Sequence, residues 1–409
     1  MSFWKLSYER NGLLLKNETY KLYSSLPIYS RHKTWTEIDL EALRHNYRLI
    51  RGIVDGSRII CVLKADAYGH GADSCARALL DEGCDFFAVS CIEEAVALRQ
   101  VCTEMGRRAD ILLLGYTLPY SAGVLAANNI IQTVFSPEYA LALNAEACRQ
   151  GCFVRAHIKL DTGMNRLGFV AQGEKTIKQA AEDIADVCAL KNLSIEGMFT
   201  HFAKADEASE KDGDMTLRQY DRFEGVNRLL LENGIKIPFL HVANSAASVR
   251  YPKLKLDGVR EGILLYGARP SAVADIEGLR PVMSLKTVIS HIHTLQSGES
   301  VSYGGDFSAE DERLLATIPI GYADGFVRAF SGAKVSIATR KGREEARIVG
   351  RICMDQCMID ITGTTAGVGD VVTLFGEEPD QLYDLAERAG TIDYECLCLI
   401  SGRVPRVYK

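Results

Sequence analysis

The sequence lacks three features that would each place it in a particular class of protein. It has no basic excess, because its formal net charge is -6 and its pI is about 5.8, whereas nucleic-acid-binding proteins usually carry a basic face. It has no apolar run of the roughly 18 residues that a transmembrane helix needs. Its N-terminal stretch lacks the apolar core of a signal peptide. We therefore expect a cytoplasmic protein with neither a nucleic-acid partner nor a membrane partner.

Paired cysteines of the kind that bind zinc are also missing. The chain has 12 cysteines, but the spacings Cys353-x3-Cys357 and Cys396-x-Cys398 differ from standard zinc-site spacings and have no matching second pair. Most of the others lie in apolar runs, where a reduced thiol behaves as a small hydrophobic side chain. We expect reduced thiols and no metal site.

What the chain does have is a long alternation of two patterns. It contains 409 residues, 47% of them hydrophobic, which is enough for two domains. From about residue 40, helix-periodic segments alternate with short apolar runs, as in a parallel sheet covered by helices. Eight such runs suit a TIM barrel, and a doubly wound open sheet is the alternative. The candidate strands are 58–63, 86–90, 111–115, 130–135, 154–160, 193–202, 237–244 and 262–267.

The pattern changes after Pro270. Alternating apolar segments separated by glycine-rich turns follow, and helical periodicity is nearly absent until residue 381, which predicts a mainly β domain. We therefore predict an α/β chain with a (β/α)8 TIM barrel over 34–270 and a β domain over 271–409. Residues 1–33 show no clear period and form an N-terminal extension.

The stretch "CVLKADAYGHG" places Lys64 immediately after the first candidate strand. In TIM barrels the carboxyl ends of the strands form the active face. Partial burial there would lower the pKa of the amine and allow it to form a Schiff base. The alternative is a lysine that only extends its amine from the strand end to solvent.

Other candidate strands also end in polar residues. A ring of such residues around one barrel mouth indicates a site more strongly than any single residue does. Ser245, together with backbone N–H groups at Gly262 and Ile263, would suit a phosphate, which the late loops of such barrels often bind. The ring consists of Lys64, Lys159, Asp161, Arg166, His201, Ser245 and Arg260.

Nine stretches, in the same order along the chain, resemble the bacterial alanine racemases. This resemblance implies a barrel with a C-terminal β domain, pyridoxal 5'-phosphate (PLP) as the cofactor, and a homodimer whose β domains cap the partners' barrels. The stretches are "VLKADAYGHG" (62–71), "IKLDTGMNRLGF" (158–169), "THFAKADE" (200–207), "ANSAA" (243–247), "VREGILLYG" (259–267), "VSYGGDF" (301–307), "IPIGYADG" (318–325), "GRICMDQ" (350–356) and "TIDYE" (391–395).

The resemblance assigns the two bases and the cofactor ligands. Lys64 would hold PLP and act as one base, and the partner subunit's Tyr303 would be the second base. Arg260 would face the pyridine nitrogen, and His201 would link Arg260 to Tyr303. The phosphate would be held by Tyr68, Ser245, Gly262, Ile263 and Tyr394.

The remaining implied roles concern the substrate. Arg166 would contact the phenolic oxygen of the cofactor and help to bind the substrate carboxylate. Met354 would bind that carboxylate through its backbone, and Tyr322 would narrow the entrance. Lys159 neighbours Arg166 and is carbamylated in some relatives.

Elementary chemistry agrees with this assignment. Racemisation removes the α-proton from one face of a carbon and returns it to the other, which favours two bases on opposite sides, and lysine and tyrosine can serve. Because both have reference pKa values of about 10, each needs burial or nearby cations to work near neutral pH. Arginine only donates hydrogen bonds, so Arg260 would disfavour a protonated ring and hence transamination.

We therefore expect interconversion of L-alanine and D-alanine for peptidoglycan synthesis. A serine or broad-specificity racemase is an alternative, although Tyr394 stands where related serine racemases are expected to have asparagine. Remoter alternatives are a PLP-dependent decarboxylase and a PLP-binding regulatory protein. Glu261 departs from the family, which has an apolar residue or proline there, and we expect it to point away from the ring in a strand-end loop.

Overall fold

The computed structural model describes residues 32–208 and 214–409. All but the last two residues of the predicted N-terminal extension therefore lie outside the described residues. The chain divides into two compact units. The barrel unit comprises Ile38–Met283 with the last two residues of the chain, and the β unit comprises Ser284–Val407 with the described residues up to Glu37.

Eight parallel strands of the barrel unit follow one another in the order β10-β2-β3-β4-β5-β6-β8-β9, and the short β7 (Phe169–Val170) pairs with β6 outside this order. The two outer strands approach each other, since the backbone N–H of Arg260 donates to the carbonyl of Ala243 at 3.0 Å. This nearly closed barrel confirms the predicted TIM architecture and excludes the open sheet. The strands are β2 (Arg58–Val62), β3 (Phe86–Val89), β4 (Asp110–Leu113), β5 (Ile131–Val134), β6 (Val154–Asp161), β8 (Leu193–Phe199), β9 (Phe239–His241) and β10 (Gly258–Glu261).

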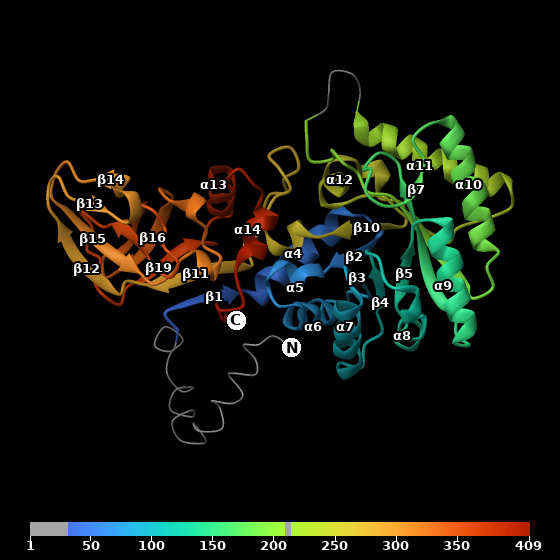
Figure 1. The fold of residues 1–409 in the computed structure, drawn as a ribbon, viewed down its shortest axis with the longest axis horizontal. Helices are drawn as coiled ribbons and strands as arrows, with labels where there is room; N and C mark the ends of the chain where they lie inside the picture. The colour runs from blue at the N-terminus through green and yellow to red at the C-terminus, as the bar shows by residue number, and fades with distance from the viewer. Residues whose placement is uncertain (1–31, 209–213) are drawn as a thin grey trace. The chain divides into compact units, whose positions relative to one another are not determined.

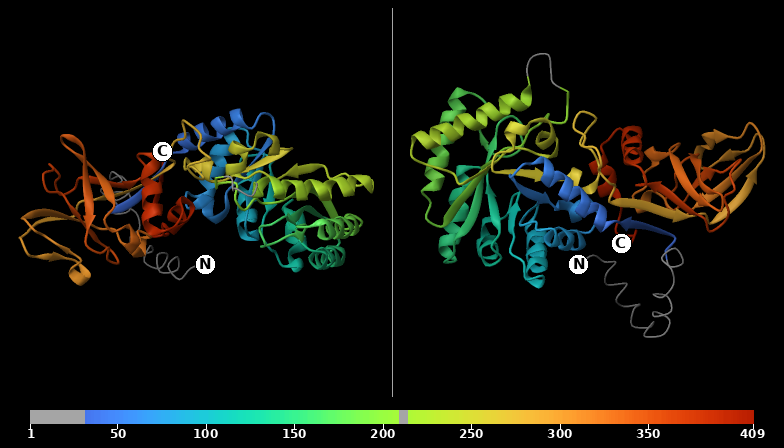
Figure 2. Two further views of the ribbon diagram at one scale, coloured as in Figure 1. Left: turned by 90° about the horizontal axis from the view of Figure 1, so that it is seen from above. Right: turned by 180° about the vertical axis from the view of Figure 1, so that it is seen from behind.

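Helices cover the outside of this sheet (Figures 1 and 2). In the first of them, the buried residues Leu43, Tyr47 and Ile50 recur at helical spacing along one face. The helix begins where the side chain of Asp39 accepts a hydrogen bond from the backbone of Ala42 at 2.8 Å. The covering helices are α4 (Leu40–Ile53), α6 (Ala72–Asp81), α7 (Ile92–Glu104), α8 (Ala122–Ala127), α9 (Pro137–Arg149), α10 (Glu174–Cys188) and α11 (Met215–Glu232).

The prediction for the eighth strand, at 262–267, was wrong. β10 ends at Glu261, and the next residues form a short 3-10 helix, η3 (Ile263–Tyr266). Gly262, with φ -119° and ψ -93°, separates the two elements. An apolar run of this length reads equally well as a strand or as a buried helical turn. The correction places Arg260 and Glu261 inside a barrel strand instead of before it.

The β unit is built on one sheet in the order β12-β15-β18-β17-β16-β19-β11-β1-β20, which confirms a mainly β second domain. Two of its strands, β1 and β20, come from near the two ends of the described chain and pair with each other. β1 therefore belongs to this sheet and not to the barrel. The strands are β1 (Thr34–Ile38), β11 (Met283–Val288), β12 (His291–Leu295), β15 (Arg313–Ile318), β16 (Lys334–Thr339), β17 (Gly342–Val349), β18 (Cys357–Asp360), β19 (Val371–Phe375) and β20 (Arg406–Tyr408).

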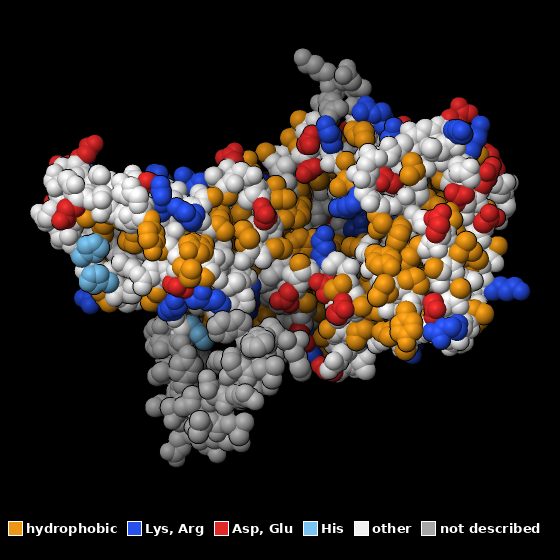
Figure 3. Space-filling model, viewed as in Figure 1, with side chains coloured by type: hydrophobic (Ala, Val, Ile, Leu, Met, Phe, Trp, Pro, Cys, Tyr) orange, Lys and Arg blue, Asp and Glu red, His pale blue; other side chains and the backbone are white. Residues whose placement is uncertain are grey.

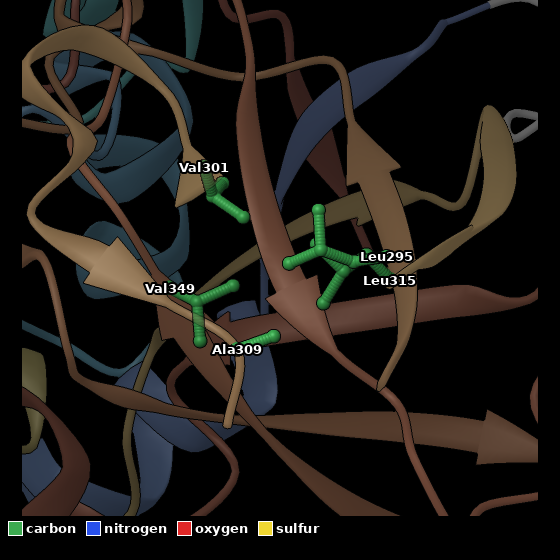
Figure 4. Close-up of a cluster of buried hydrophobic side chains, with 5 residues drawn as sticks. All are labelled: Leu295, Val301, Ala309, Leu315 and Val349. Atoms are coloured by element: carbon green, nitrogen blue, oxygen red, sulfur yellow. The ribbon is translucent and has the colours of Figure 1, made fainter. Parts of the chain in front are cut away.

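A hairpin and two helices complete the β unit. The hairpin pairs β13 (Ser300–Val301) with β14 (Phe307–Ser308), and Tyr303 lies in the turn between them. Its strands are fixed by a buried cluster of Leu295, Val301, Ala309, Leu315 and Val349 (Figure 4). The helices are α13 (Pro379–Ala389) and α14 (Asp393–Leu399).

The face drawn in Figure 3 shows no single dominant charge. On the face in Figure 3, acidic and basic side chains are interspersed over each unit. All 12 cysteines are free thiols. No helix within the described ranges is both long and apolar enough to cross a bilayer.

Candidate active site

The predicted reactive lysine begins a turn of left-handed helix after β2. Lys64 is the first residue of α5 (Lys64–Tyr68), and the next four residues have φ between 53° and 55°. For residues other than glycine this conformation costs roughly 1–2 kcal/mol each, so the surrounding structure must hold it. The turn brings the half-buried Lys64 close to Tyr68, with Nζ 5.9 Å from the centroid of the phenol ring.

Two carboxylates connect this turn to the neighbouring helices, Glu94 from outside the turn and Asp66 from within it. Glu94 of α7 accepts from the backbone N–H of Ala65 through Oε1 at 2.7 Å. Its other oxygen accepts from the backbone N–H and the hydroxyl of Ser90, at 2.8 Å and 3.0 Å. Asp66 accepts from the backbone N–H of Ala72, the first residue of α6, at 2.7 Å. The turn is thus tied to the starts of both neighbouring helices.

Three residues predicted to hold a phosphate meet just past β10. The backbone N–H of Gly262 donates to Ser245 Oγ at 2.9 Å. A Cβ added at Gly262 would lie 2.6 Å from the hydroxyl oxygen of Tyr68. Ser245 begins α12 (Ser245–Arg250) and Ile263 begins η3, and the first N–H groups of helical segments lack partners within the segment. The hydroxyls of Tyr68 and Ser245 and the backbone at Gly262 and Ile263 therefore lie together as a cradle, in which a side chain at position 262 would collide with the Tyr68 hydroxyl.

Arg260 is buried in the barrel and most of its donors are already used. Its Nη1 donates to Nδ1 and to the carbonyl oxygen of His241, both at 2.9 Å. Its Nη2 donates to the carbonyl oxygens of Thr200 and Val242 at 2.7 Å and 2.9 Å, and lies 3.4 Å from His201 Nδ1. Burial lowers the pKa of Arg260 to about 9, which leaves it charged at neutral pH. These contacts fix the guanidinium through its two terminal nitrogens, and among the described residues Nε–H has no hydrogen-bond acceptor.

A second histidine extends this network into the barrel. Nε2 of His241 lies 3.0 Å from Nδ1 of His157. Because arginine can only donate, His241 must accept at Nδ1 and carry its proton on Nε2, which it donates to His157. Burial lowers the pKa of His157 to about 3, and burial together with the charge of Arg260 holds the pKa of His241 well below its usual value. Both imidazoles are therefore neutral and orient Arg260 by hydrogen bonds alone.

Lys159, at the end of β6, is buried without a hydrogen-bond partner for Nζ among the described residues. Its Nζ lies 5.4 Å from the centroid of the Phe199 ring. Burial, followed by the positive charges of Arg260 and Arg166, lowers the pKa of Lys159 to about 8. This cluster of cations would be stabilised by an added negative group.

The loop that carries Arg166 is organised by one buried carboxylate. Asp161 accepts from the backbone N–H groups of Gly163 and Asn165, both at 3.0 Å, and of Arg166 at 2.9 Å. The side chain of Arg166 remains exposed. The backbone under Arg166 is thus fixed while its guanidinium stays available for an anionic ligand.

The expectation that Glu261 lies in a loop was wrong, because it is the last residue of β10 and is fully buried. Successive side chains of a strand point to opposite faces, so the carboxyl lies on the other face of the strand from the Arg260 guanidinium. Neither carboxyl oxygen makes a hydrogen bond to a described residue. Burial raises the pKa of Glu261, against a smaller lowering by the nearby hydroxyls of Ser248 and Ser245. The barrel environment therefore favours the protonated carboxyl.

Three of the predicted residues of the β unit, Tyr303, Tyr322 and Met354, are on neighbouring segments that hydrogen-bond to one another. Ser302, next to Tyr303, donates through its hydroxyl to the carbonyl of Arg351 at 2.7 Å and lies 3.4 Å from Cys353 Sγ. The backbone N–H of Tyr322 donates to the carbonyl of Cys353 at 3.1 Å. The hairpin turn and the two loops therefore form one connected surface of the β unit.

The side chains on this surface are open. Tyr303 is 71% exposed, Met354 53% and Tyr322 42%. Tyr394, in α14, is half-buried. The side chains of Tyr303, Met354 and Tyr322 are therefore accessible to a ligand or to another protein surface.

The predicted residues thus fall into two groups. The barrel group meets around one barrel mouth and consists of Lys64, Tyr68, Lys159, Arg166, His201, Ser245, Arg260, Gly262 and Ile263. The β-unit group consists of Tyr303, Tyr322, Met354 and Tyr394.

Sequence reasoning missed Glu94 and His241. His241 ends β9, so it carried the same strand-end signal as the residues that were selected. Glu94 gave no such signal. A glutamate in the first turn of a helix is common there because the helix dipole stabilises its negative charge. Only the structure shows it bonded to the peptide after Lys64.

Comparison with known proteins decides the family. The model of the alanine racemase N-terminal domain matches residues 38–270, and that of the C-terminal domain matches residues 282–408. The chain belongs to the alanine racemase family. This is a family of PLP-dependent isomerases.

Alanine racemases from several organisms align with nearly the whole chain. That of Desulfovibrio desulfuricans is 43% identical over 377 residues, which cover 91% of this chain and 97% of the relative. That of Methanococcus maripaludis is 40% identical over 92% of this chain and 99% of its own length.

Solved alanine racemase structures agree in fold. That of Clostridium difficile 630 has a TM-score of 0.84 at 41% identity, covering 92% of this chain and 96% of its own. That of Streptomyces coelicolor A3(2) has a TM-score of 0.83 at 31% identity, covering 92% and 98%. Both domains of the family are therefore present, which argues against a PLP-binding regulatory protein with a lone barrel.

Proposed function

We propose that the protein interconverts L-alanine and D-alanine with PLP as its cofactor, and so supplies D-alanine for peptidoglycan. The observation that carries the proposal is the meeting of five groups at one barrel mouth. An amine, two hydroxyls, a backbone cradle and a buried arginine lie together there. These are Lys64, Tyr68, Ser245, Gly262 and Arg260.

These residues fit PLP in chemical type. Lys64 would hold it covalently, and the hydroxyl and N–H donors around Gly262 suit phosphate oxygens. The Nε–H of Arg260 would face the ring nitrogen. The hydrogen bonds to His241 and Thr200 would hold the guanidinium in place for this contact. When bound, PLP withdraws electrons from the substrate α-carbon and makes its proton acidic. Because Arg260 stays a donor, it does not pass a proton to the ring nitrogen, which disfavours transamination.

Two bases would move the α-proton from opposite faces. We assign Lys64 to one face and the partner subunit's Tyr303 to the other, which requires a homodimer with composite sites. The exposure of Tyr303 supports this, since a base in an open turn needs a second surface to enclose it. His201, whose pKa burial and the cations Arg260 and Lys159 hold well below its usual value, would link Arg260 to the phenol as a neutral imidazole.

The substrate carboxylate would be held by two groups that the structure leaves available. Arg166 offers an exposed guanidinium on a backbone fixed by Asp161. Met354 would contribute its backbone from the loop that also bonds to the Tyr322 segment. Tyr322 would narrow the entrance, and Tyr394 would add a hydroxyl to the phosphate.

Lys159 is suited to carbamylation. The reaction needs a neutral amine, and a pKa of about 8 provides a larger neutral fraction than an ordinary lysine has. The carbamate would carry a negative charge close to Arg260 and Arg166. Carbon-13 NMR of the folded protein in carbon-13-labelled bicarbonate would detect it, and a spectrum without a carbamate resonance would contradict the modification.

The test of the function is D/L interconversion with purified protein and four amino acids: alanine, serine, lysine and arginine. We expect alanine to be racemised fastest and serine more slowly, because a pocket cannot strongly reject a substrate that only adds a hydroxyl. Faster racemisation of serine would support the serine alternative. Release of carbon dioxide without racemisation would overturn the proposal in favour of a decarboxylase.

A further inference from the structure

The left-handed turn at Lys64 depends on a residue of another helix. The peptide between Lys64 and Ala65 starts the strained segment, and its N–H donates to Glu94 Oε1 at 2.7 Å. This bond fixes the plane of the peptide directly after the lysine. Any rotation of that peptide would redirect the Lys64 side chain.

Glu94 is itself fixed at its other oxygen. That oxygen accepts from the backbone N–H of Ser90 at 2.8 Å and from the Ser90 hydroxyl at 3.0 Å. Ser90 follows β3, the neighbour of β2 in the barrel. One carboxylate therefore bridges two adjacent strand ends, and it accepts three hydrogen bonds in doing so.

The left-handed form gains support from the bridge because its own residues disfavour it. The four residues after Lys64 all have positive φ and none is glycine, a conformation that L-residues avoid. Tyr68, the last of them, points its hydroxyl to the cradle at Gly262. Loss of the turn would therefore disturb both the lysine and a hydroxyl of the phosphate cradle.

We propose that Glu94 is a positioning residue, which holds the left-handed turn and so presents Lys64 and Tyr68 to the cofactor. The proposal rests on the proposed function to the extent that Lys64 and Tyr68 bind PLP. The hydrogen bonds of Glu94 go to the backbone of Ala65 and to Ser90, so it would act through the backbone of the turn.

The variant Glu94→Gln isolates this role. Glutamine keeps the size of the side chain and one oxygen for Ala65, but its amide nitrogen meets the N–H of Ser90, so the three hydrogen bonds cannot all form. Glu93→Gln is the matched control, because it removes the same charge from the preceding, exposed residue of α7. Ser90→Ala is a milder variant that removes only the hydroxyl bond.

Two measurements on the full-length protein test the proposal. Amide hydrogen exchange of residues 63–71, with and without added PLP, reports the turn itself. PLP titration reports the consequence for the cofactor. For Glu94→Gln we expect exchange without PLP to be about tenfold faster in this segment alone and PLP binding to be about tenfold weaker, the loss typical of one hydrogen bond to a charged group. Ser90→Ala should show smaller changes in the same directions, and Glu93→Gln should match the wild type.

Each other outcome has a definite meaning. Unchanged exchange in residues 63–71 of Glu94→Gln would show that Glu94 does not hold the turn. Faster exchange with unchanged PLP binding would show that the turn does not position the cofactor ligands. Either result overturns the proposal. Failure of the wild-type protein to bind PLP would instead refute the proposed function, and the exchange comparison would still report on the turn. If Glu94→Gln failed to fold, Ser90→Ala would decide the question by the same two measurements.

Discussion

The barrel group and the β-unit group are built in opposite ways. In the barrel, Arg260 and Lys159 are each at most 4% exposed, and Arg260 donates to three backbone carbonyls. In the β unit, Tyr303 and Met354 are more than half exposed and rest on loops. The barrel group has its geometry before any ligand arrives, whereas the β-unit group presents side chains that need an opposing surface.

This difference separates two kinds of task. Fixed cations and hydroxyls suit a cofactor that remains in place, because rigid donors lose little freedom on binding. Exposed side chains on a second unit suit a substrate that must enter and leave. We therefore expect substitutions of the barrel residues that would hold the cofactor to weaken its binding, and substitution of Tyr303 to impair proton transfer with the cofactor retained.

Lys64→Ala should give the largest effect, since it removes both the covalent attachment and one base. We expect racemisation to be abolished and the visible absorption of lysine-bound PLP to be absent. Borohydride reduction followed by peptide mapping should label the wild-type segment at Lys64 and leave the variant unlabelled. Labelling at Lys159 in the wild type would contradict the assignment.

Tyr303→Phe tests the β-unit group, because it should slow proton transfer and leave PLP binding unchanged. Loss of a general acid or base costs about 10²–10⁴-fold in rate, while PLP content should match the wild type because no barrel residue changes. Solvent proton exchange, followed separately from D-alanine and from L-alanine, should slow more for one enantiomer. Equal slowing for both would contradict bases on opposite faces.

Gly262→Ala should weaken PLP binding without removing any functional group. The added Cβ would lie 2.6 Å from the hydroxyl of Tyr68 and fill the cradle. We expect PLP affinity to fall by about tenfold or more, corresponding to 1.4 kcal/mol. Gly52→Ala is the control, because a Cβ at that helical position meets nothing within 4 Å. Equal affinity of the two variants would show that the phosphate binds elsewhere.

Glu261→Gln should give the smallest effect, visible mainly in pH dependence. Burial raises the pKa of the folded-state carboxyl above its unfolded value of 4.5, so the wild type loses stability as the pH rises from there through the folded pKa. Glutamine does not ionise. Thermal unfolding should therefore show a difference in melting temperature in favour of the variant, which grows as the pH rises above 4.5 through the raised pKa of the folded carboxyl. A difference independent of pH would mean that the carboxyl is ionised in the folded protein throughout.

The sequence predicted most of the architecture because barrel strands and covering helices have different periods. It placed the eighth strand wrongly, since the run at 262–267 is apolar in every position and has no period to read. It also missed strands β1 and β20, whose pairing joins distant parts of the chain and depends on no local pattern.

The candidate site was predictable where strand ends carry unusual polar residues, as at Lys64 and Arg260. The contacts that hold these residues in place could not be predicted from the sequence. Glu94 acts through a backbone N–H of another segment, and the orientation of His241 follows from the donors of Arg260. Such contacts depend on three-dimensional proximity, which a single sequence does not encode position by position.

The central claim is that each active site combines the barrel of one subunit with the β unit of another. Mixing Lys64→Ala with Tyr303→Ala, each inactive alone, tests it most directly after the subunits have been allowed to exchange. Half of the dimers in an equal mixture should be mixed, and each should hold one intact site of two, so we predict recovery of about a quarter of wild-type activity. No recovery, with subunit exchange demonstrated by native mass spectrometry, would contradict the composite site.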